Sequence, residues 1–363
     1  GAWGAEVSAP VPGPSAAPVA EPVTPVGPWS GNLSLRTWSG YNDNPRLSAV
    51  NPVGSPLLAG GGDVLVFRDG EDGHEASVFA SVEHVGYLER GVEPETLVIA
   101  EAAYVYRGSS GWLAGASMEY LFLKQVFDAS EVVGVPVVIP TRGHTWTFRP
   151  KVGREWGDGW SVELRGELGR QWLEEPLDSY WDHGFDLTLT WEPGVRDRFQ
   201  VISGLQRRSF DDRLARAADG ELLDHVLEYD QVEVEGLWTR IWDERRRWRT
   251  TVRGGYRVSV DNGGGLFDYD RWSAAVVLRH VQPKWEVRVD GRARWYLYPG
   301  QEVGEMGATA RRRADLSLTA RAEYALHSTL RVFVQYTLED SDENTAFSDY
   351  RMGTVAGGLE YSM

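Results

Sequence analysis

The stretch KWEVRVDGRARWYLY, residues 284–298, decides the fold of this chain, because its apolar and charged residues alternate with a period of two. One parity is apolar, aromatic or small (Trp285, Val287, Val289, Gly291, Ala293, Trp295, Leu297), and the other is charged in nearly every position (Lys284, Glu286, Arg288, Asp290, Arg292, Arg294). The two tryptophans are ten residues apart, which at about 3.3 Å per residue and a tilt of about 40° gives about 25 Å, the height of the apolar band on a transmembrane barrel. The stretch therefore predicts a transmembrane β-strand.

The same period recurs along the chain. Residues 160–172 again begin and end in tryptophan, with Arg170 as the one charged residue on the apolar parity. Residues 248–259 and 313–324 alternate in the same way. The repeated unit is a β-hairpin, and the pattern runs from about residue 31 to residue 363, so we predict one all-β domain over that range.

Composition agrees with a barrel in a membrane. The 16 Trp and 15 Tyr outnumber the 11 Phe, a bias typical of rings at a lipid–water boundary. No apolar run reaches the roughly 18 residues of a membrane helix. The net charge of −16 argues against a nucleic-acid-binding protein, and the absence of cysteine excludes disulfides, thiolate metal sites and a cysteine nucleophile. We expect no cofactor.

The first 30 residues differ from the rest, and we predict a Pro/Ala-rich periplasmic leader or tether over residues 1–30. Ala2-Trp3-Gly4-Ala5 looks like the small-residue end of a removed secretory signal. Residues 7–28 contain seven prolines, which favours an extended, semi-rigid segment. Such a segment could bind a periplasmic or envelope partner.

Breaks between the alternating runs are short and long in turn. The longer, polar or Gly-rich breaks lie at residues 43–61, 89–94, 127–141, 174–180, 211–221, 261–266, 299–310 and 341–348. With both termini in the periplasm, short periplasmic turns and long external loops, this predicts a transmembrane antiparallel up-and-down barrel of about 16 strands. The first two strands, near residues 31–42 and 62–69, are the weakest, so 14 strands is the other possibility. A soluble sandwich or propeller also alternates, but it predicts strands of about five or six residues, whereas most of these runs have about 11 to 16.

Two segments resemble known families. The last residues, Gly358-Leu359-Glu360-Tyr361-Ser362-Met363, are similar to the C-terminal signal of bacterial outer-membrane β-barrels, with Met363 where Phe is usual. Residues 40–45, GYNDNP, resemble the opening of the β-barrel porin families, some of them linked to exopolysaccharide and sorting systems. The resemblance implies an integral outer-membrane barrel in contact with outer-membrane lipid and read by the barrel-assembly machinery through Gly358, Tyr361 and Met363. It implies no particular solute.

The inner wall is the first candidate functional site. If the apolar parity faces lipid, the opposite parity lines the lumen, and we predict these pore-lining residues: Arg249, Arg253, Arg257, Arg288, Arg292, Arg294, Arg321, Glu233, Glu235, Glu163 and Glu167. The membrane-interface girdle is predicted to contain Trp160, Trp172, Trp248, Trp285 and Trp295. Opposed charges would create a transverse field that sorts solutes, whereas neighbouring Arg and Glu that simply pair along the wall would add rigidity without selectivity. Both interpretations stay open.

Two other kinds of site are weighed and set aside. Asp182-His183 and Asp224-His225 could supply an Asp-oriented general base, as in outer-membrane proteases, but adjacent residues on a strand point to opposite faces. Glu339, Asp340, Asp342, Glu343 and Asn344 crowd the predicted last external loop, and Asp211 and Asp212 begin another, near Arg208, Arg213 and Arg216. Their spacing matches no EF-hand, so we predict solvated acidic loops and no metal site.

The leading hypothesis is a porin-like channel for passive diffusion of small polar or anionic solutes. The alternative is a non-conducting envelope barrel that docks a partner through residues 7–28. An outer-membrane hydrolase is the third hypothesis and has the least support from the sequence. The oligomeric state stays open.

Overall fold

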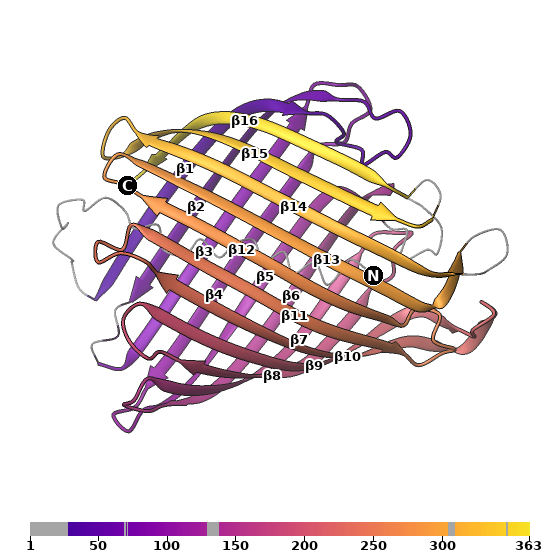
Figure 1. The fold of residues 1–363 in the computed structure, drawn as a ribbon, viewed down its shortest axis with the longest axis horizontal. Helices are drawn as coiled ribbons and strands as arrows, with labels where there is room; N and C mark the ends of the chain where they lie inside the picture. The colour runs from indigo at the N-terminus through magenta and orange to yellow at the C-terminus, as the bar shows by residue number, and fades with distance from the viewer. Residues whose placement is uncertain (1–27, 69, 71, 129–137, 304–308, 346–347) are drawn as a thin grey trace.

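The computed structural model describes residues 28–68, 70, 72–128, 138–303, 309–345 and 348–363, and they form one closed antiparallel β-barrel (Figure 1). No helix in this part of the chain is long and apolar enough to cross a membrane. The strands are β1 (Trp29–Asn42), β2 (Ser55–Arg68), β3 (His74–Tyr87), β4 (Glu95–Arg107), β5 (Trp112–Asp128), β6 (Val138–Glu155), β7 (Trp160–Leu173), β8 (Tyr180–Trp191), β9 (Asp197–Arg216), β10 (Leu222–Ile241), β11 (Trp248–Asp261), β12 (Tyr269–Val281), β13 (Trp285–Val303), β14 (Thr309–Ala325), β15 (Leu330–Glu343) and β16 (Tyr350–Ser362).

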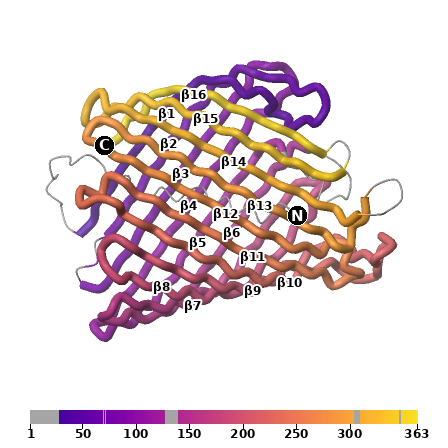
Figure 2. The backbone as a smooth tube through the Cα atoms, viewed as in Figure 1, coloured from indigo at the N-terminus to yellow at the C-terminus, as the bar shows by residue number. Residues whose placement is uncertain are grey.

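Each strand pairs with its neighbours in chain order, and β1 closes the barrel against β16. The closing register sets Ser34 opposite Ser362 and Asn42 opposite Thr354. Because a closed barrel has no free edge, every strand has hydrogen-bonding partners on both sides. The prediction of 16 antiparallel strands is confirmed, and the alternative of 14 is wrong. Figure 2 shows the strands crossing the barrel obliquely, as closure requires.

The connections differ from the predicted ones at several places. β2 begins at Ser55, so Gly60 and Gly61 lie inside the strand and not in a loop over 43–61. β9 and β10 have 20 residues each, which leaves only residues 217–221 between them, and β13 continues to Val303. Polar residues at these places predict a loop, but in the structure they continue the hydrogen-bonded ladder beyond the apolar band. Length alone therefore distinguishes the two ends of the barrel less sharply than predicted.

The two ends are nevertheless distinct, and we name them by their connections. The short-turn end has the connection between β2 and β3 and every second one after it; the start of β1 and the end of β16 also lie there, where Leu33 and Met363 exchange backbone hydrogen bonds. The long-loop end has the connection between β1 and β2 and every second one after it. There Asn44 is buried and its side-chain amide donates to the carbonyls of Ser48 and Arg351, so the loop is held against β16.

The barrel has an apolar outer face and a charged inner face. Side chains on the concave face converge, so they can reach across an intervening strand. Arg36 on β1 is 3.4 Å from Glu83 on β3, and Gln231 on β10 is 3.5 Å from Tyr269 on β12. These residues therefore mark the inner parity. The opposite parity carries exposed aliphatic residues such as Leu187, Val234 and Val276.

Candidate functional site: the charged inner wall

The arginines of β11 to β14 lie side by side on the inner face. The register sets Arg249 opposite Arg279, Arg279 opposite Arg288, and Arg288 opposite Arg321. Directly paired residues share one face of a sheet, so these four side chains form a row across four strands. We call Arg249, Arg279, Arg288 and Arg321 the arginine row. Like charges directly opposite one another repel, so the row requires nearby anions.

Three members of the row have such anions. Arg279 is 2.7 Å from Glu286, and Arg288 is 2.8 Å from Asp290. Arg321 lies 2.7 Å from Glu323 and 2.8 Å from Glu360. Each carboxylate is on the same strand or the next, except Glu360, which reaches Arg321 across β15, so neutralisation is local.

The acidic residues predicted for the lumen form neighbouring ion pairs as well. Glu233 accepts from Arg257 and, across β11, from Arg271 at 2.6 Å. Arg253 is 3.8 Å from Glu235. On β7, Glu163 lies 3.5 Å from Lys151 and Glu167 lies 2.9 Å from Arg149. These carboxylates therefore follow the second interpretation given above, in which neighbouring Arg and Glu pair along the wall.

Two predicted arginines differ from the rest. Arg249 and Arg294 make no ion pair with any residue that the structure describes, although both lie on the inner parity. Arg292, between Arg294 and the arginine row on the same strand, has an interaction partner. The basic wall therefore keeps two charges that are not neutralised by a described neighbour, one toward each end.

The opposite wall is acidic, and sequence reasoning missed it. β4 is eight strands from β12 in a closed ring of 16, so β2 to β5 face β10 to β13 across the barrel. Their inner parity carries the carboxylates Asp63, Glu75, Glu83, Glu95, Glu101 and Glu119. Arg107 is the inward cation of these strands among the described residues, and it pairs with Glu75 at 2.8 Å. The signal was present, since these acids alternate with apolar residues, but their position across the barrel follows only from closure.

Within the acidic wall, Glu101 is the counterpart of Arg249 and Arg294. It stands directly opposite Glu119 in the register between β4 and β5. Glu119 is 3.2 Å from Arg149. Glu101 has no hydrogen bond or ion pair with a described residue. A free carboxylate thus faces two free guanidinium groups across the interior.

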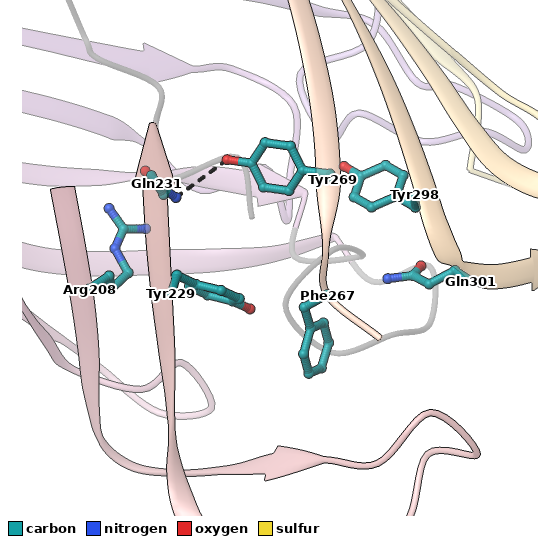
Figure 3. A pocket seen from close by; sticks show the side chains of 7 residues that line it. All are labelled: Arg208, Tyr229, Gln231, Phe267, Tyr269, Tyr298 and Gln301. Carbon is teal, nitrogen blue, oxygen red and sulfur yellow. Dashed lines mark hydrogen bonds between the residues drawn. The ribbon is translucent and has the colours of Figure 1, made fainter. Parts of the chain in front are cut away.

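A packed aromatic cluster lines the inner face of β8 to β13 at the long-loop end (Figure 3). Tyr229, Phe267, Tyr269 and Tyr298 are buried there, and Arg208 lies beside them around a cavity of about 10 Å³, room for about one water. The cluster also contains Tyr180, Phe210, Ala215, Leu227 and Tyr296. Nothing in the alternation of single strands predicted this cluster, because its members come from five strands and one loop.

The loop over residues 262–268 closes this cluster and is held by two carboxylates. Asp261 accepts backbone hydrogen bonds from Gly263, Gly265 and Phe267 at 2.8 to 3.0 Å. Asp268 accepts the backbone N–H of Asp261 at 2.7 Å, and burial raises the pKa of Asp268. The loop places Phe267 against the inner wall and so reinforces that wall.

The Asp-His pairs are not catalytic dyads. Asp182 faces inward and binds Arg208 through two 2.9 Å contacts, whereas His183 lies on the outer parity. Asp224 and His225 are exposed, with Nδ1 of His225 3.6 Å from the Asp224 carboxylate. Among the described residues, neither histidine has a hydrogen bond to a serine or to a second carboxylate.

The acidic stretch near residue 340 is not a loop, which corrects the prediction. β15 continues to Glu343, so its acids alternate between faces and cannot converge on one ion. Glu343 pairs with Arg311, and Asp340 stands opposite Arg351. Among the residues described, no group of three or more His, Asp or Glu side chains could hold a metal.

Asp211 and Asp212 also lie within a strand, β9, and not at the start of a loop. Asp211 pairs with Arg170, the one charged residue on the apolar parity of β7. The sequence had instead placed Arg208, Arg213 and Arg216 near it. Arg170 lies on the outer face between Trp172 and Trp181, with its guanidinium carbon 5.3 and 5.0 Å from the ring centroids. Arg208 binds Asp182, and Arg213 lies over the rings of Phe210 and Phe267.

The five tryptophans predicted for the interface all lie on the outer parity and are exposed. Trp160, Trp248 and Trp285 are at the short-turn end, and Trp172 and Trp295 are at the long-loop end. Trp160 stacks on Trp191 with 5.5 Å between ring centroids. The ring centroid of His280 is 3.9 Å from that of Trp248 and 4.8 Å from that of Trp285. Two belts of rings thus border the apolar face.

The residues of the C-terminal motif belong to β16. Gly358 faces inward against β1, where an added Cβ would lie 2.2 Å from the Thr37 carbonyl oxygen, so glycine is required for closure. Tyr361 is exposed on the outer parity, and Met363 bonds to Leu33 at the start of the barrel. Their recognition by an assembly machinery stays a prediction.

Comparison with known proteins gives likeness in fold. No family model matches the chain, and no curated protein matches it. Among solved structures, a "Bacterial polysaccharide outer membrane secretin" is similar with a TM-score of 0.45 and 11% identity over 91% of this chain and 97% of that one. OprD from Pseudomonas aeruginosa has a TM-score of 0.45 and 11% identity over 92% and 94%. An anion-selective porin from Comamonas acidovorans has 0.44 and 9% over 92% and 99%. Such low identities and TM-scores carry no argument about the function of this chain.

Proposed function

We propose that this protein is an integral outer-membrane channel for the passive diffusion of small polar or anionic solutes. The observation that carries the proposal is the pair of facing walls, the arginine row with Arg249 and Arg294 on one side and the acidic wall with Glu101 on the other. Free charges of opposite sign in a wet lumen of low-dielectric walls create a transverse field, which orders water and sorts solutes by charge.

Location follows from the outer face. Exposed aliphatic side chains bordered by two aromatic belts suit a bilayer, and a closed barrel satisfies all backbone hydrogen bonds there. We assign the short-turn end, with the first and last strand termini, to the periplasm, as short periplasmic turns are the rule in such barrels. This assignment puts the aromatic cluster at the external mouth.

The test is a planar bilayer with the full-length protein. We expect discrete conductance steps of stable size and, under a salt gradient, a reversal potential that reports anion preference. The preference should weaken at high salt, because about 1 M salt shortens the Debye length to about 3 Å.

If the folded protein gives no conductance in the bilayer, the channel proposal is contradicted. This result would favour the non-conducting barrel that docks a partner through residues 7–28, of which 7–27 lie outside the described residues. Deleting residues 1–28 separates the remaining cases: new conductance identifies a plug, and loss of a co-purifying partner identifies a dock.

A further inference from the structure

Arg154 is the residue of the outer face that the channel does not explain. It lies on β6 at the short-turn end, one residue before the strand ends, with its guanidinium carbon 5.2 Å from the ring centroid of Trp112 and 5.7 Å from that of Trp156. Both tryptophans are exposed on the outer side. The cation therefore lies over two rings at the edge of the apolar band.

Its charge has no described counter-ion. Arg154 makes no ion pair with a described residue, and its buried Nε has no hydrogen-bond partner. The neighbouring carboxylate, Glu155, points inward and pairs with Arg107. At the edge of the apolar band a lipid-facing guanidinium is tolerated, and it lies at the depth where lipid phosphate groups can accompany it.

Comparable arginines on the outer face do have carboxylates. Arg170, between Trp172 and Trp181, donates to both oxygens of Asp211. Arg240, over Trp242 at 4.8 Å, lies 3.5 Å from Asp197. The arrangement around Arg154 is the same motif with the anion missing from the protein.

We propose that Arg154, Trp112 and Trp156 bind the phosphate of an anionic phospholipid headgroup. The guanidinium fork matches two phosphate oxygens, the rings preorganise it, and their apolar edges cover the glycerol and first methylenes of the lipid. Phosphate lies at the depth of an interfacial tryptophan belt. The choice of phospholipid rests on the proposed periplasmic assignment of the short-turn end, whereas phosphate recognition follows from the side chains alone.

Native mass spectrometry of the delipidated full-length barrel, titrated with phosphatidylglycerol, tests the site. We expect the Arg154→Gln variant to lose the tightest bound lipid, with affinity about tenfold lower, because a charge-assisted pair is removed. Arg170→Gln is the matched control and should bind phosphatidylglycerol as the wild type does, since its charge is already neutralised. Arg154→Lys, which keeps the charge without the fork, should bind with intermediate affinity and serves if the Gln variant does not fold.

Two results would overturn the proposal: equal phosphatidylglycerol binding by wild type and Arg154→Gln, or an equal loss in Arg170→Gln. Inorganic phosphate is the competitor. Displacement of the lipid by it at equal concentration would identify a simple anion site and would refute the lipid. Conductance in bilayers is measured on the same variants and should not change, so failure of the lipid site and failure of the channel are distinguishable.

Discussion

The inner wall of β11 to β14 and the wall of β2 to β5 are built from the same alternating strands, yet they reach opposite charge by different means. The basic wall packs arginines in register and neutralises most of them with carboxylates on the same or a nearby strand, as Arg288 with Asp290 and Arg279 with Glu286. The acidic wall has few cations, so Glu101 stays free. Dense pairing makes a wall rigid, and only the unpaired remainder is available to solutes.

The difference extends to the long-loop end. There the basic side is backed by the aromatic cluster around Tyr269, which joins β8 to β13, while β2 to β5 carry no buried aromatic cluster among the described residues. The predictions below test the two walls in order of expected effect.

The largest effect is expected from replacing Arg288, Arg292 and Arg294 together with Glu. Three positive charges become three negative ones, so the basic wall loses its sign and the reversal potential in a salt gradient should move toward cation selectivity. The corresponding Lys triple variant is the control and should keep the wild-type preference. Unchanged selectivity in the Glu variant would show that these residues of β13 do not line the conducting path.

A sharper test compares Arg249 with Arg279, neighbours in the arginine row. Arg249→Gln removes a charge without a described partner and should reduce anion preference with little change in stability. Arg279→Gln leaves the half-buried Glu286 unpaired and should lower the free energy of unfolding by about 1–2 kcal/mol. Urea unfolding in lipid vesicles and bilayer recording measure both quantities. The reverse ranking would mean that pairing does not decide which charges act on solutes.

On the acidic wall, Glu101→Gln should raise anion preference by less than the effects above, because one free charge is removed. Glu119→Gln is the matched control. It frees Arg149 only in part, since Arg149 keeps Glu167 at 2.9 Å, and it should change selectivity less than Glu101→Gln. Equal shifts in both variants would show that local pairing does not screen this wall.

The smallest effect is expected for Tyr269→Phe in the aromatic cluster. The lost hydrogen bond to Gln231 is long, 3.5 Å, so the cost should be at most about 0.5 kcal/mol in urea unfolding. Phe267→Ala at the same site removes a buried ring and should cost about 3 kcal/mol. If both substitutions are neutral, the cluster does not stiffen the basic wall.

Local alternation predicted much of this molecule. The parity of residues 284–298 assigned Arg288, Arg292 and Arg294 to one face and Trp285 and Trp295 to the other, as found. The number of strands followed from counting the alternating runs, which gave an even number, as a barrel with both termini at one end requires. The predicted breaks were less accurate near residues 211 and 340, because polar residues end an apolar band without ending a hydrogen-bonded strand.

Which charges neutralise one another, and which stand opposite one another, depended on the closed barrel. A period of two assigns a residue to a face but says nothing of its register, so the contact of Glu233 with Arg271 across β11 was not visible in the alternation. Closure brings β4 opposite β12, far apart in the chain, and thereby makes Glu101 face the arginine row. The amino-acid pattern thus determined the strands and their two faces, because alternation is a local property of the backbone. Tertiary structure alone decided the pairing and the facing walls, because these depend on contacts between strands.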